Sequence, residues 1–580
     1  MRRLPLLTLL YLAACAAPGA GASRGSHRLI EPPQVTRAVD LPPGTRIAAA
    51  TAGAFPEQPA WAAVRTWWRE SIAQTRRWSV ATARTTETRQ LLLRYVDETG
   101  ELTASLLGAD TELPLASLPI PEAADSAQLS GALDRLAWAS RLALGEQVSR
   151  PVPVALVTSA DPRVVAAVDD AAALVETGAF ADAYAALRSA RRLDGGAPFV
   201  LSPLAALELL RGEAAQAQAI SREAARYPAR CAPTTQHQIA RTLLLASAAL
   251  APTRAHSVDL ELRRFARVAR GERPHDDEVI YTEALALNFL GDFAAAKPLL
   301  EALHKRQPQR AFIAYHLGWA CLGTGEADAA ARHLAAAGRT LPTPWMLLPR
   351  CIALYAAGRG EELAEVLEDA AASTARGRVM THQVLRMQAA HALLDGRPED
   401  ARARLVANLR HLVQNPLELD QRAGEFAEAG AVLIRIGGAP ELPALLAAAQ
   451  KLPIQAATKD AVAFVGGMDQ IARTGRRSRP LEASLSRNGA SAWGVLLTAY
   501  AHEREGEVGA MQTALARAAR LSSSPMTKAL LAKSLRSVGK AEEADRLRDT
   551  LRREMLEFHL RARCLHPIFG PELAYAFLVR

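Results

Sequence analysis

Residues 291–342, GDFAAAKPLLEALHKRQPQRAFIAYHLGWACLGTGEADAAARHLAAAGRTLP, decide the fold class of this 580-residue chain. The stretch holds one order of residue types twice: a glycine, an alanine five positions on, a leucine nine on and a proline seventeen on. The two sets are Gly291, Ala296, Leu300 and Pro308, then Gly325, Ala330, Leu334 and Pro342. The two glycines lie 34 residues apart, so the stretch contains an internal repeat.

Each copy has the composition of two antiparallel helices joined by a tight turn. Glycine adopts positive φ without steric cost and so permits the turn. The small alanine lets the second helix lie close to the first, and proline ends that helix before the next unit. Because one hairpin cannot bury its apolar face alone, we expect consecutive hairpins to stack into a continuous core.

The same signature extends in both directions from this stretch. Gly178 and Gly212 also lie 34 residues apart and begin the same pattern. Further turn glycines follow at irregular spacing, at Gly358, Gly396, Gly437, Gly475, Gly506 and Gly539. The two-period interval between Gly212 and Gly291 predicts one degenerate hairpin over residues 234–270. The pattern therefore predicts a mainly α-helical solenoid of about ten hairpins over residues 160–560.

This region resembles the tetratricopeptide repeat proteins, whose period is 34 residues. The best matches are Gly178, Gly212, Gly291 and Gly325. The aromatic residue that the family has early in its first helix is often missing, with Tyr281, Tyr315 and Trp345 as partial substitutes, and the C-terminal repeats fit generic helical hairpins equally well. The resemblance implies a non-catalytic groove that binds protein or peptide segments. Its arginines suit acidic or carboxy-terminal segments.

Residues 45–150 follow another pattern, which predicts a small α+β domain. We expect strands over 45–51, 78–83, 88–96, 101–107 and 113–120, and helices over 58–77 and 126–146. The turn signal at residues 97–100 separates two alternating segments and predicts a hairpin. Trp61 and Trp68 share one face of the first helix, where they either pack in the core or form a binding surface.

The order of these elements is similar to that of the amino-terminal domain of TolB and of the related periplasmic lipoproteins FlgO and CsgG. The resemblance rests on element order and not on a diagnostic motif. It implies a non-catalytic module that takes part in assemblies at the bacterial envelope.

The first 15 residues have the pattern of a signal peptide. Two arginines precede an apolar run over residues 4–12, which is shorter than the about 20 apolar residues that span a bilayer. The sequence LAAC at residues 12–15 resembles the lipobox of bacterial lipoproteins, which implies that Cys15 is lipidated and anchors the chain. Because Ala16 and not Asp follows, the resemblance implies the periplasmic face of the outer membrane. The alternative is an ordinary signal peptide that is cut after Ala20 or Ala22.

Two further segments flank the folded regions. Residues 16–44 contain five prolines with several glycines and serines, and we expect a flexible tether there. Residues 561–580 form an apolar tail broken by Gly570 and Pro571. This tail either caps the last hairpin or docks elsewhere.

The composition and charge limit the classes of function. Hydrophobic residues make up 49% and charged residues 22% of the chain, and the formal net charge is +9. The densest basic run, residues 473–479, has no interleaved aromatic residue. It is either a solvated loop or helix end, or a patch for an acidic partner. We therefore expect no nucleic-acid partner.

The sequence contains no GxSxG, HExxH, Walker A or GxGxxG motif, so we expect neither an enzyme nor a cofactor. The thirteen histidines are scattered, and His382 and His391 are nine residues apart on one expected helix, a spacing that does not suit two metal ligands. We therefore expect no metal site. Cys321 and Cys351 are either small core residues or a disulfide. Paired carboxylates such as Asp276 and Asp277 are expected at helix starts.

Together these patterns predict an outer-membrane-anchored, non-catalytic scaffold that displays a repeat groove in the periplasm and assists envelope assembly or secretion. The alternative function is an accessory component of a polysaccharide export system or of a cell-wall enzyme system.

Overall fold

The computed structural model describes residues 35–561 apart from short internal gaps. The gaps are residue 40, 43–44, 53, 76–78, 82–88, 108–110, 147–151, 212, 252–254, 341–343, 375–380, 488–491 and 522–524. Cys15, Gly212 and the expected C-terminal cap from residue 562 onward lie outside the described residues. Contacts divide the chain into two compact units, residues 1–324 with 332–342 and residues 325–331 with 343–580. Each unit is described by itself.

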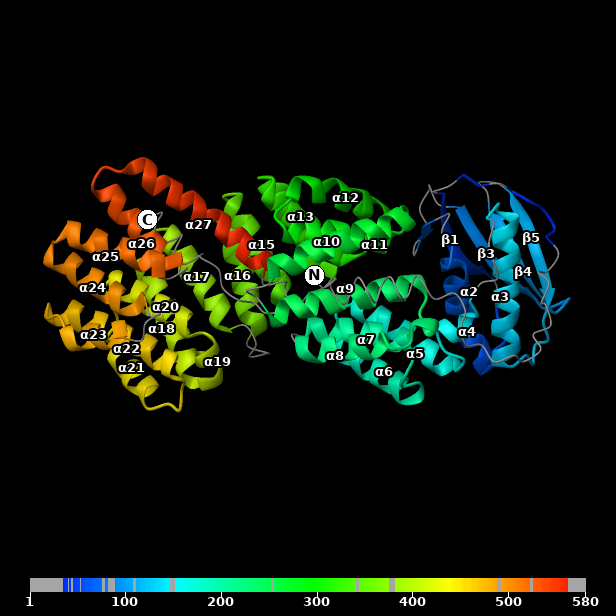
Figure 1. Cartoon of the computed structure of the whole chain (residues 1–580), viewed down its shortest axis with the longest axis horizontal. Coiled ribbons are helices and arrows are strands. Elements are labelled where there is room, and N and C mark those ends of the chain that lie inside the picture. The colour runs from blue at the N-terminus through cyan, green and yellow to red at the C-terminus, as the bar shows by residue number, and fades with distance from the viewer. Residues whose placement is uncertain are drawn as a thin grey trace, which may run out of the picture. The chain divides into compact units, whose positions relative to one another are not determined.

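The first unit begins with a small α+β domain (Figure 1). Its sheet has the strand order β2-β1-β3-β4-β5, with β1 parallel to both β2 and β3 and with antiparallel β3–β4 and β4–β5 pairs. The elements are β1 (Arg46–Ala52), η1 (Pro59–Ala63), α2 (Val64–Ala73), β2 (Ser79–Ala81), β3 (Arg89–Val96), β4 (Glu101–Leu107), β5 (Glu112–Pro119) and α3 (Ser126–Ala143). The expected α+β domain is confirmed.

Helices α2 and α3 cover the sheet and enclose its core. Leu91, Leu93 and Tyr95 alternate along β3, so their side chains lie on the buried face. Trp67 and Trp68 are both 0% exposed and belong to the same core. The indole nitrogen of Trp67 donates to the Ser159 carbonyl at 3.2 Å. The tryptophans of α2 therefore pack in the core and do not form a binding surface.

The end of the proline-rich segment belongs to this domain. The Thr36 amide donates to the Leu115 carbonyl at 2.8 Å, and the Val39 amide donates to the Ala143 carbonyl at 2.5 Å. Leu41 is buried in the domain core. These residues are folded onto the sheet domain, because their backbone groups find partners on β5 and α3.

The rest of the first unit consists of consecutive helix hairpins. Each helix packs antiparallel on the next, and the first helix of a hairpin also contacts that of its neighbour. The helices are α4 (Val154–Val157), α5 (Pro162–Glu176), α6 (Phe180–Leu193), α7 (Pro198–Leu210), α8 (Ala214–Ala224), η2 (Pro228–Arg230), α9 (Pro233–Leu250), α10 (Ala255–Glu272), α11 (Asp277–Phe289), α12 (Phe293–Arg306), α13 (Ala311–Gly323) and α14 (Ala327–Thr340). The boundary between the units runs through α14. Helices α9 and α10 form one hairpin in the two-period interval between Gly212 and Gly291.

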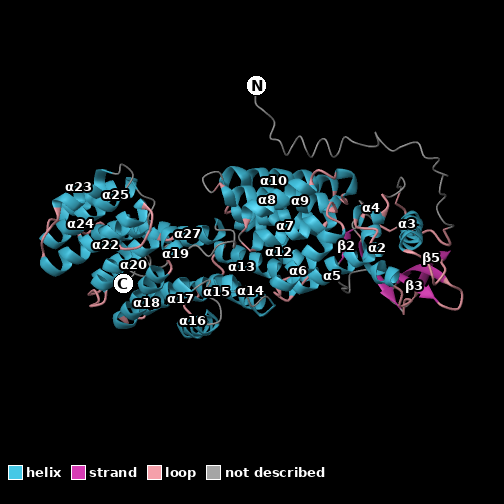
Figure 2. Cartoon of the chain, turned by 90° about the horizontal axis from the view of Figure 1, so that it is seen from below, coloured by secondary structure: helices cyan, strands magenta, loops and turns pink. Residues whose placement is uncertain are grey.

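The second unit continues the array (Figures 1 and 2). Its helices are α15 (Pro344–Ala356), α16 (Gly360–Thr374), α17 (Thr381–Leu394), α18 (Pro398–Gln414), α19 (Pro416–Gln421), α20 (Ala423–Arg435), α21 (Leu442–Gln450), α22 (Ala456–Thr474), α23 (Arg479–Arg487), α24 (Ala492–Glu505), α25 (Val508–Leu521), α26 (Pro525–Ser537) and α27 (Ala541–Arg561). The short α19 is an extra element between two hairpins. The protein is therefore mainly α-helical, a tetratricopeptide-like solenoid preceded by an α+β domain, which confirms the expected fold class.

The repeat signature positions the helices as its residue types suggest. Gly178, Gly291 and Gly325 lie between the two helices of a hairpin and have φ of 80°, 78° and 85°. Glycine adopts these positive φ values without steric cost. Ala296 and Ala330 are 0% exposed, so the second helix of each hairpin approaches the first closely at these positions. Among the described residues, no helix combines the length and apolar character needed to cross a membrane.

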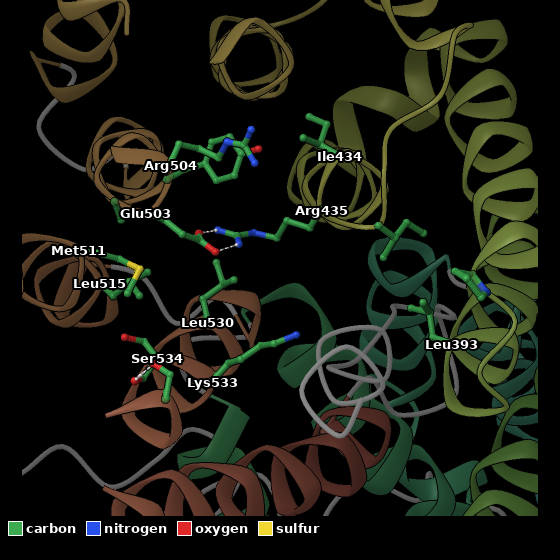
Figure 3. Close-up of a pocket in the computed structure, with 15 residues that line it drawn as sticks. Leu393, Ile434, Arg435, Glu503, Arg504, Met511, Leu515, Leu530, Lys533 and Ser534 are labelled. Carbon is green, nitrogen blue, oxygen red and sulfur yellow. Dashed lines mark hydrogen bonds and ion pairs between the residues drawn. The ribbon is translucent and has the colours of Figure 1, made fainter. Parts of the chain in front are cut away.

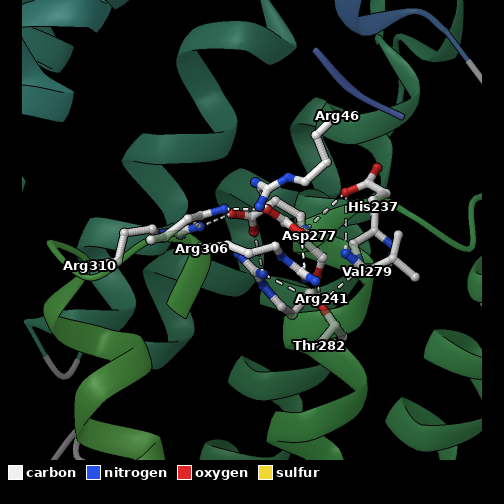
Figure 4. A network of polar contacts seen from close by, with 11 residues as sticks. Arg46, His237, Arg241, Asp277, Val279, Thr282, Arg306 and Arg310 are labelled. Carbon is white, nitrogen blue, oxygen red and sulfur yellow. Dashed lines mark hydrogen bonds and ion pairs between the residues drawn. The ribbon is translucent and has the colours of Figure 1, made fainter. Parts of the chain in front are cut away.

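A buried ionic network ties the sheet domain to the repeats within the first unit (Figure 4). The Asp277 carboxylate, at the start of α11, accepts from Arg46 of β1 at 3.2 Å, from Arg306 at 2.6 Å and from Gln307 at 2.6 Å. The Asp277 side chain is only 8% exposed. Asp276 caps the helix by accepting from the Glu278 amide at 2.9 Å. The paired acids thus serve the helix start and also hold β1 against α11.

Glu278 extends the same network on the next residue. Its carboxylate accepts from Arg310 at 2.7 Å and from Arg241 at 2.8 Å. Burial alone would raise the pKa of Glu278, but the two guanidinium groups outweigh burial and hold that pKa well below its usual range. Glu278 therefore stays ionised and joins helices α9, α11 and α13.

Candidate functional site

One candidate site is an open groove in the second unit (Figure 3). It has a volume of about 690 Å³ and is lined by side chains of helices α17, α18, α20, α24, α25 and α26 and of Ile436, which follows α20. The lining residues are Leu393, Pro398, Ile434, Arg435, Ile436, Ala499, Tyr500, Glu503, Arg504, Met511, Leu515, Leu530, Lys533, Ser534 and Ser537. Because the lining helices belong to different hairpins, the groove is a product of repeat stacking.

Arg435 organises the centre of the groove. Its guanidinium forms a two-pronged ion pair with Glu503, with nitrogen–oxygen distances of 2.6 and 2.8 Å. It also lies over the Tyr500 ring, 4.9 Å from the ring centroid. The Arg435 side chain is 10% exposed. Glu503 and the Tyr500 ring together fix this guanidinium in one orientation, which a flexible surface arginine lacks.

Two polar atoms at the groove have no partner among the described residues. They are the Nε atom of Arg435 and the hydroxyl of Ser534, both of which are buried. The Ser534 carbonyl, by contrast, accepts from the Ser537 hydroxyl at 2.7 Å. Buried polar groups without partners are costly, and both atoms are closed to solvent.

The charge at the groove is positive. Arg504 and Lys533 both line it and are exposed, and Arg435 forms its ion pair with Glu503. Burial raises the pKa of Tyr500, although the nearby arginines oppose that shift. Met511 and Leu515 supply an apolar wall. The groove thus combines apolar area with a cationic rim, which suits a partner with apolar and acidic side chains.

The sequence-predicted site residues lie elsewhere. Gly178, Gly291 and Gly325 occupy hairpin turns and line no groove, and Gly212 and Cys15 lie outside the described residues. The groove residues were not singled out from the sequence, because Arg435 and Glu503 are 68 residues apart and no local pattern pairs them.

The basic run and the two cysteines considered from the sequence do not line this groove. The basic run at 473–479 crosses from α22 to α23, with Arg473 paired to Asp469 at 2.9 Å and Arg477 paired to Glu482 at 2.8 Å. Cys321 and Cys351 are buried and do not form a disulfide with each other. Burial raises the pKa of Cys351 to about 12, so this thiol behaves as a small core residue.

Two groups of side chains have the donor types and spacing of a metal site. His382, His411 and Glu418 form one group, and His502, Glu505 and Glu507 form the other. Burial alone would raise the pKa of Glu418, but hydrogen bonds from His382 and His411 outweigh burial and lower that pKa to about 2. The sequence did not reveal the first group, because its members come from three different helices.

No protein-family model and no curated protein matches this sequence. Solved structures match its fold, among them a tetratricopeptide repeat protein from Parabacteroides merdae (13% identity, 42% of this chain and 92% of that chain, TM-score 0.26). Yeast Tom70 matches with 11% identity over 70% of this chain and 96% of its own, at a TM-score of 0.29. The human IFIT1 dimer with m7Gppp-AAAA matches with 12% identity over 67% of this chain and 89% of that chain, at a TM-score of 0.34. Similarity at this level carries no functional assignment to this chain.

Proposed function

We propose that this protein is a non-catalytic scaffold whose second unit binds an acidic segment of a partner protein in the α17–α26 groove. The observation that carries the proposal is the groove itself, an apolar wall with Arg504 and Lys533 at its rim. A chain segment that brings carboxylates to the rim and apolar side chains to the wall meets both properties.

The oriented guanidinium of Arg435 strengthens this proposal. Its Nε atom and the Ser534 hydroxyl are buried without partners among the described residues. Both atoms are closed to solvent, so a peptide carbonyl or carboxylate accepts from them only if side chains of the groove shift, in a charge-assisted hydrogen bond worth about 1.5–3 kcal/mol. Exposed rim charges contribute less, about 0–1 kcal/mol each.

Binding of short labelled peptides to the purified full chain tests this function. We expect a glutamate-rich peptide with leucines to bind more tightly than a lysine-rich peptide of the same length and leucine spacing. Replacing both rim cations, Arg504→Glu with Lys533→Glu, should weaken binding of the glutamate-rich peptide by at least about tenfold, which corresponds to 1.4 kcal/mol. Fluorescence anisotropy measures the two affinities.

Lys459→Glu on α22 provides a matched control. Lys459 is exposed, belongs to the same unit and does not line the groove. Lys459→Glu therefore changes the charge by the same amount as Lys533→Glu, but at a site outside the groove. Its affinity should stay within about twofold of the unmodified chain. Equal binding of the acidic and basic peptides, or an equal loss in the control, contradicts a cationic binding groove.

We also propose that Cys15 is lipidated and holds the scaffold at the periplasmic face of the outer membrane, where it assists envelope assembly or secretion. The support is the sequence LAAC at residues 12–15 after a short apolar run. The α+β domain, with an element order similar to the TolB-type module, is then a non-catalytic envelope module. Two or more acyl chains hold a protein stably at a membrane, at about 0.8 kcal/mol for each buried methylene.

Membrane fractionation with labelled palmitate tests the anchor. Cys15→Ser should abolish label incorporation and release the chain into the soluble fraction. Cys231→Ser is the control, because Cys231 is a buried free thiol whose bond to the Tyr227 carbonyl a serine can keep. Label incorporation by the Cys15→Ser variant contradicts the anchor.

A further inference from the structure

Three consecutive helices of the second unit bring two imidazoles and a carboxylate to one place. His382 is the second residue of α17, His411 lies in the last turn of α18, and Glu418 lies in the short α19. Their ligand atoms all lie within 4.8 Å of one another. The antiparallel pairing of α17 with α18 places the start of one beside the end of the other, so the cluster follows from the hairpin.

The Glu418 carboxylate lies between the two imidazoles. Its Oε1 atom is 2.5 Å from Nδ1 of His382, and its Oε2 atom is 3.0 Å from Nε2 of His411. The two rings are nearly parallel, with an interplanar angle of 14° and centroids 6.3 Å apart. One nitrogen of each ring therefore points to the same carboxylate, as required of donors that share a centre.

A second carboxylate faces the other edge of His382. The Oε2 atom of Glu425, in the first turn of α20, lies 3.7 Å from Nε2 of His382. A neutral imidazole carries a single N–H, so it can donate to a carboxylate on one side only. A cation held at the Nδ1 side leaves the Nε2–H free to donate to Glu425, which is the outer-shell arrangement common for metal-bound histidine.

The cluster is held in place by the surrounding amides and arginine. The Asn408 side chain donates to the His382 carbonyl at 2.7 Å, and the Asn415 side chain donates to the His411 carbonyl at 2.7 Å. Arg422 donates to Glu425 at 3.1 Å. These hydrogen bonds fix the backbone of both histidines and the orientation of Glu425, so the surrounding residues hold the metal-binding atoms in position.

The cluster is buried on the histidine side and exposed to solvent on the Glu418 side. The side chains of His382, His411 and Glu418 are 2%, 15% and 25% exposed. An ion there is enclosed by the two histidines and reaches water on the Glu418 side. Two histidines, one glutamate and a water molecule form a four-coordinate zinc set.

We propose that this cluster is a binding site for a divalent transition-metal ion of the zinc class, with His382 Nδ1, His411 Nε2 and the Glu418 carboxylate as protein ligands. Imidazole nitrogen favours zinc, nickel and copper, whereas magnesium and calcium prefer oxygen ligands. Zinc bonds of about 2.0–2.1 Å place tetrahedral donors about 3.3 Å apart. Glu418 must therefore withdraw from His382 by about 1 Å, which its open side allows.

The ion has a structural role in this arrangement. It joins the start of α17, the end of α18 and α19, whereas Leu393 of α17 and Pro398 of α18 line the groove at the opposite ends of these helices. The two places are 11 residues apart on α17 and 13 residues apart on α18, or about 17 and about 20 Å along the helices. The metal site thus braces the hairpin that supplies one wall of the groove, and it stands whether or not the groove binds an acidic peptide.

Zinc titration of the purified full chain, stripped with a chelator and exchanged into metal-free buffer at pH 7.5, tests this proposal. We expect one tightly bound equivalent of Zn²⁺, measured by competition with a chromophoric chelator. Co²⁺ should give the visible absorption bands of a four-coordinate ion. His411→Gln and Glu418→Gln should each weaken zinc binding by about 100-fold or more and remove those bands. Circular dichroism of each variant verifies that the chain is folded.

The second cluster supplies the control. His502 lies in the last turn of α24 and Glu507 in the turn that follows, with His502 Nδ1 2.6 Å from the Glu507 carboxylate. His502→Gln should leave the tight equivalent unchanged. The proposal is overturned if the unmodified chain takes up no tight equivalent of zinc, which leaves the cluster as hydrogen-bonded side chains only. It is equally overturned if His411→Gln and Glu418→Gln retain the tight equivalent, or if His502→Gln removes it.

Discussion

Asp277→Ala should destabilise the first unit strongly, because Asp277 balances charge at the junction between the sheet domain and the repeats. Its carboxylate contacts Arg46 at 3.2 Å and Arg306 at 2.6 Å, and all three side chains are 23% exposed or less. Removing one partner of a buried ion pair leaves uncompensated charge and costs about 3–5 kcal/mol. Asp277→Asn keeps an acceptor oxygen for Gln307 but loses the charge, so we expect about 1–3 kcal/mol.

Urea unfolding followed by tryptophan fluorescence measures this effect, because the buried Trp67 and Trp68 report on the sheet domain. Asp170→Ala is the control, since Asp170 is exposed on the neighbouring α5, and it should change the unfolding free energy by less than about 0.5 kcal/mol. Combining Asp277→Ala with Arg46→Met should cost less than the sum of the single changes. A loss below about 1 kcal/mol for Asp277→Ala, or full additivity with Arg46→Met, refutes the role of this junction.

Two other predictions concern the first unit. Gly318→Ala should destabilise it by about 1–3 kcal/mol, because the added Cβ meets Leu334 Cγ at 2.5 Å. In the control variant Gly338→Ala the added Cβ meets no atom within 4 Å, so this change should stabilise the unit by about 0.5–1 kcal/mol. Equal melting temperatures of the two variants would argue against close packing at Gly318. Burial, aided by Arg241, lowers the pKa of His316 to about 3, so the unfolded chain binds a proton that the folded chain does not as the pH falls from 6.5 toward 3. Stability should therefore fall with acidification, by up to about 1.4 kcal/mol per pH unit for this group. His316→Phe should reduce that slope in urea titrations at pH 7.5 and 5.5, and the exposed-site variant His256→Gln should leave it unchanged.

Local patterns were enough to predict the helices and strands. The 34-residue spacing of Gly291 and Gly325 reflects a turn that recurs once per hairpin, and those turns have positive φ in the structure. The alternation along residues 89–107 likewise predicted the β3–β4 hairpin. In both cases the signal lies within a few turns of chain, where periodicity directly reports which side chains are buried.

The candidate site could not be predicted in the same way. Arg435 of α20 meets Glu503 of α24 only once the helices are stacked, with α22 packed on both α20 and α24. No local sequence pattern predicts a contact between residues that are 68 positions apart. The expected absence of metal ligands rested on the spacing of His382 and His391 along one helix. The structure instead places His382 beside His411 of the next helix and Glu418 of α19, a grouping that helical spacing cannot reveal.

Helix α19 shows how a repeat array can acquire chemistry. The turn glycines at Gly396 and Gly437 lie 41 residues apart instead of 34, and the extra chain includes α19, which carries Glu418. Because each repeat depends mainly on its immediate neighbours, an insertion of this kind is absorbed locally and leaves distant hairpins unchanged. Irregular spacing in such a chain is therefore a guide to where selection has been able to add a specialised function to a structural framework.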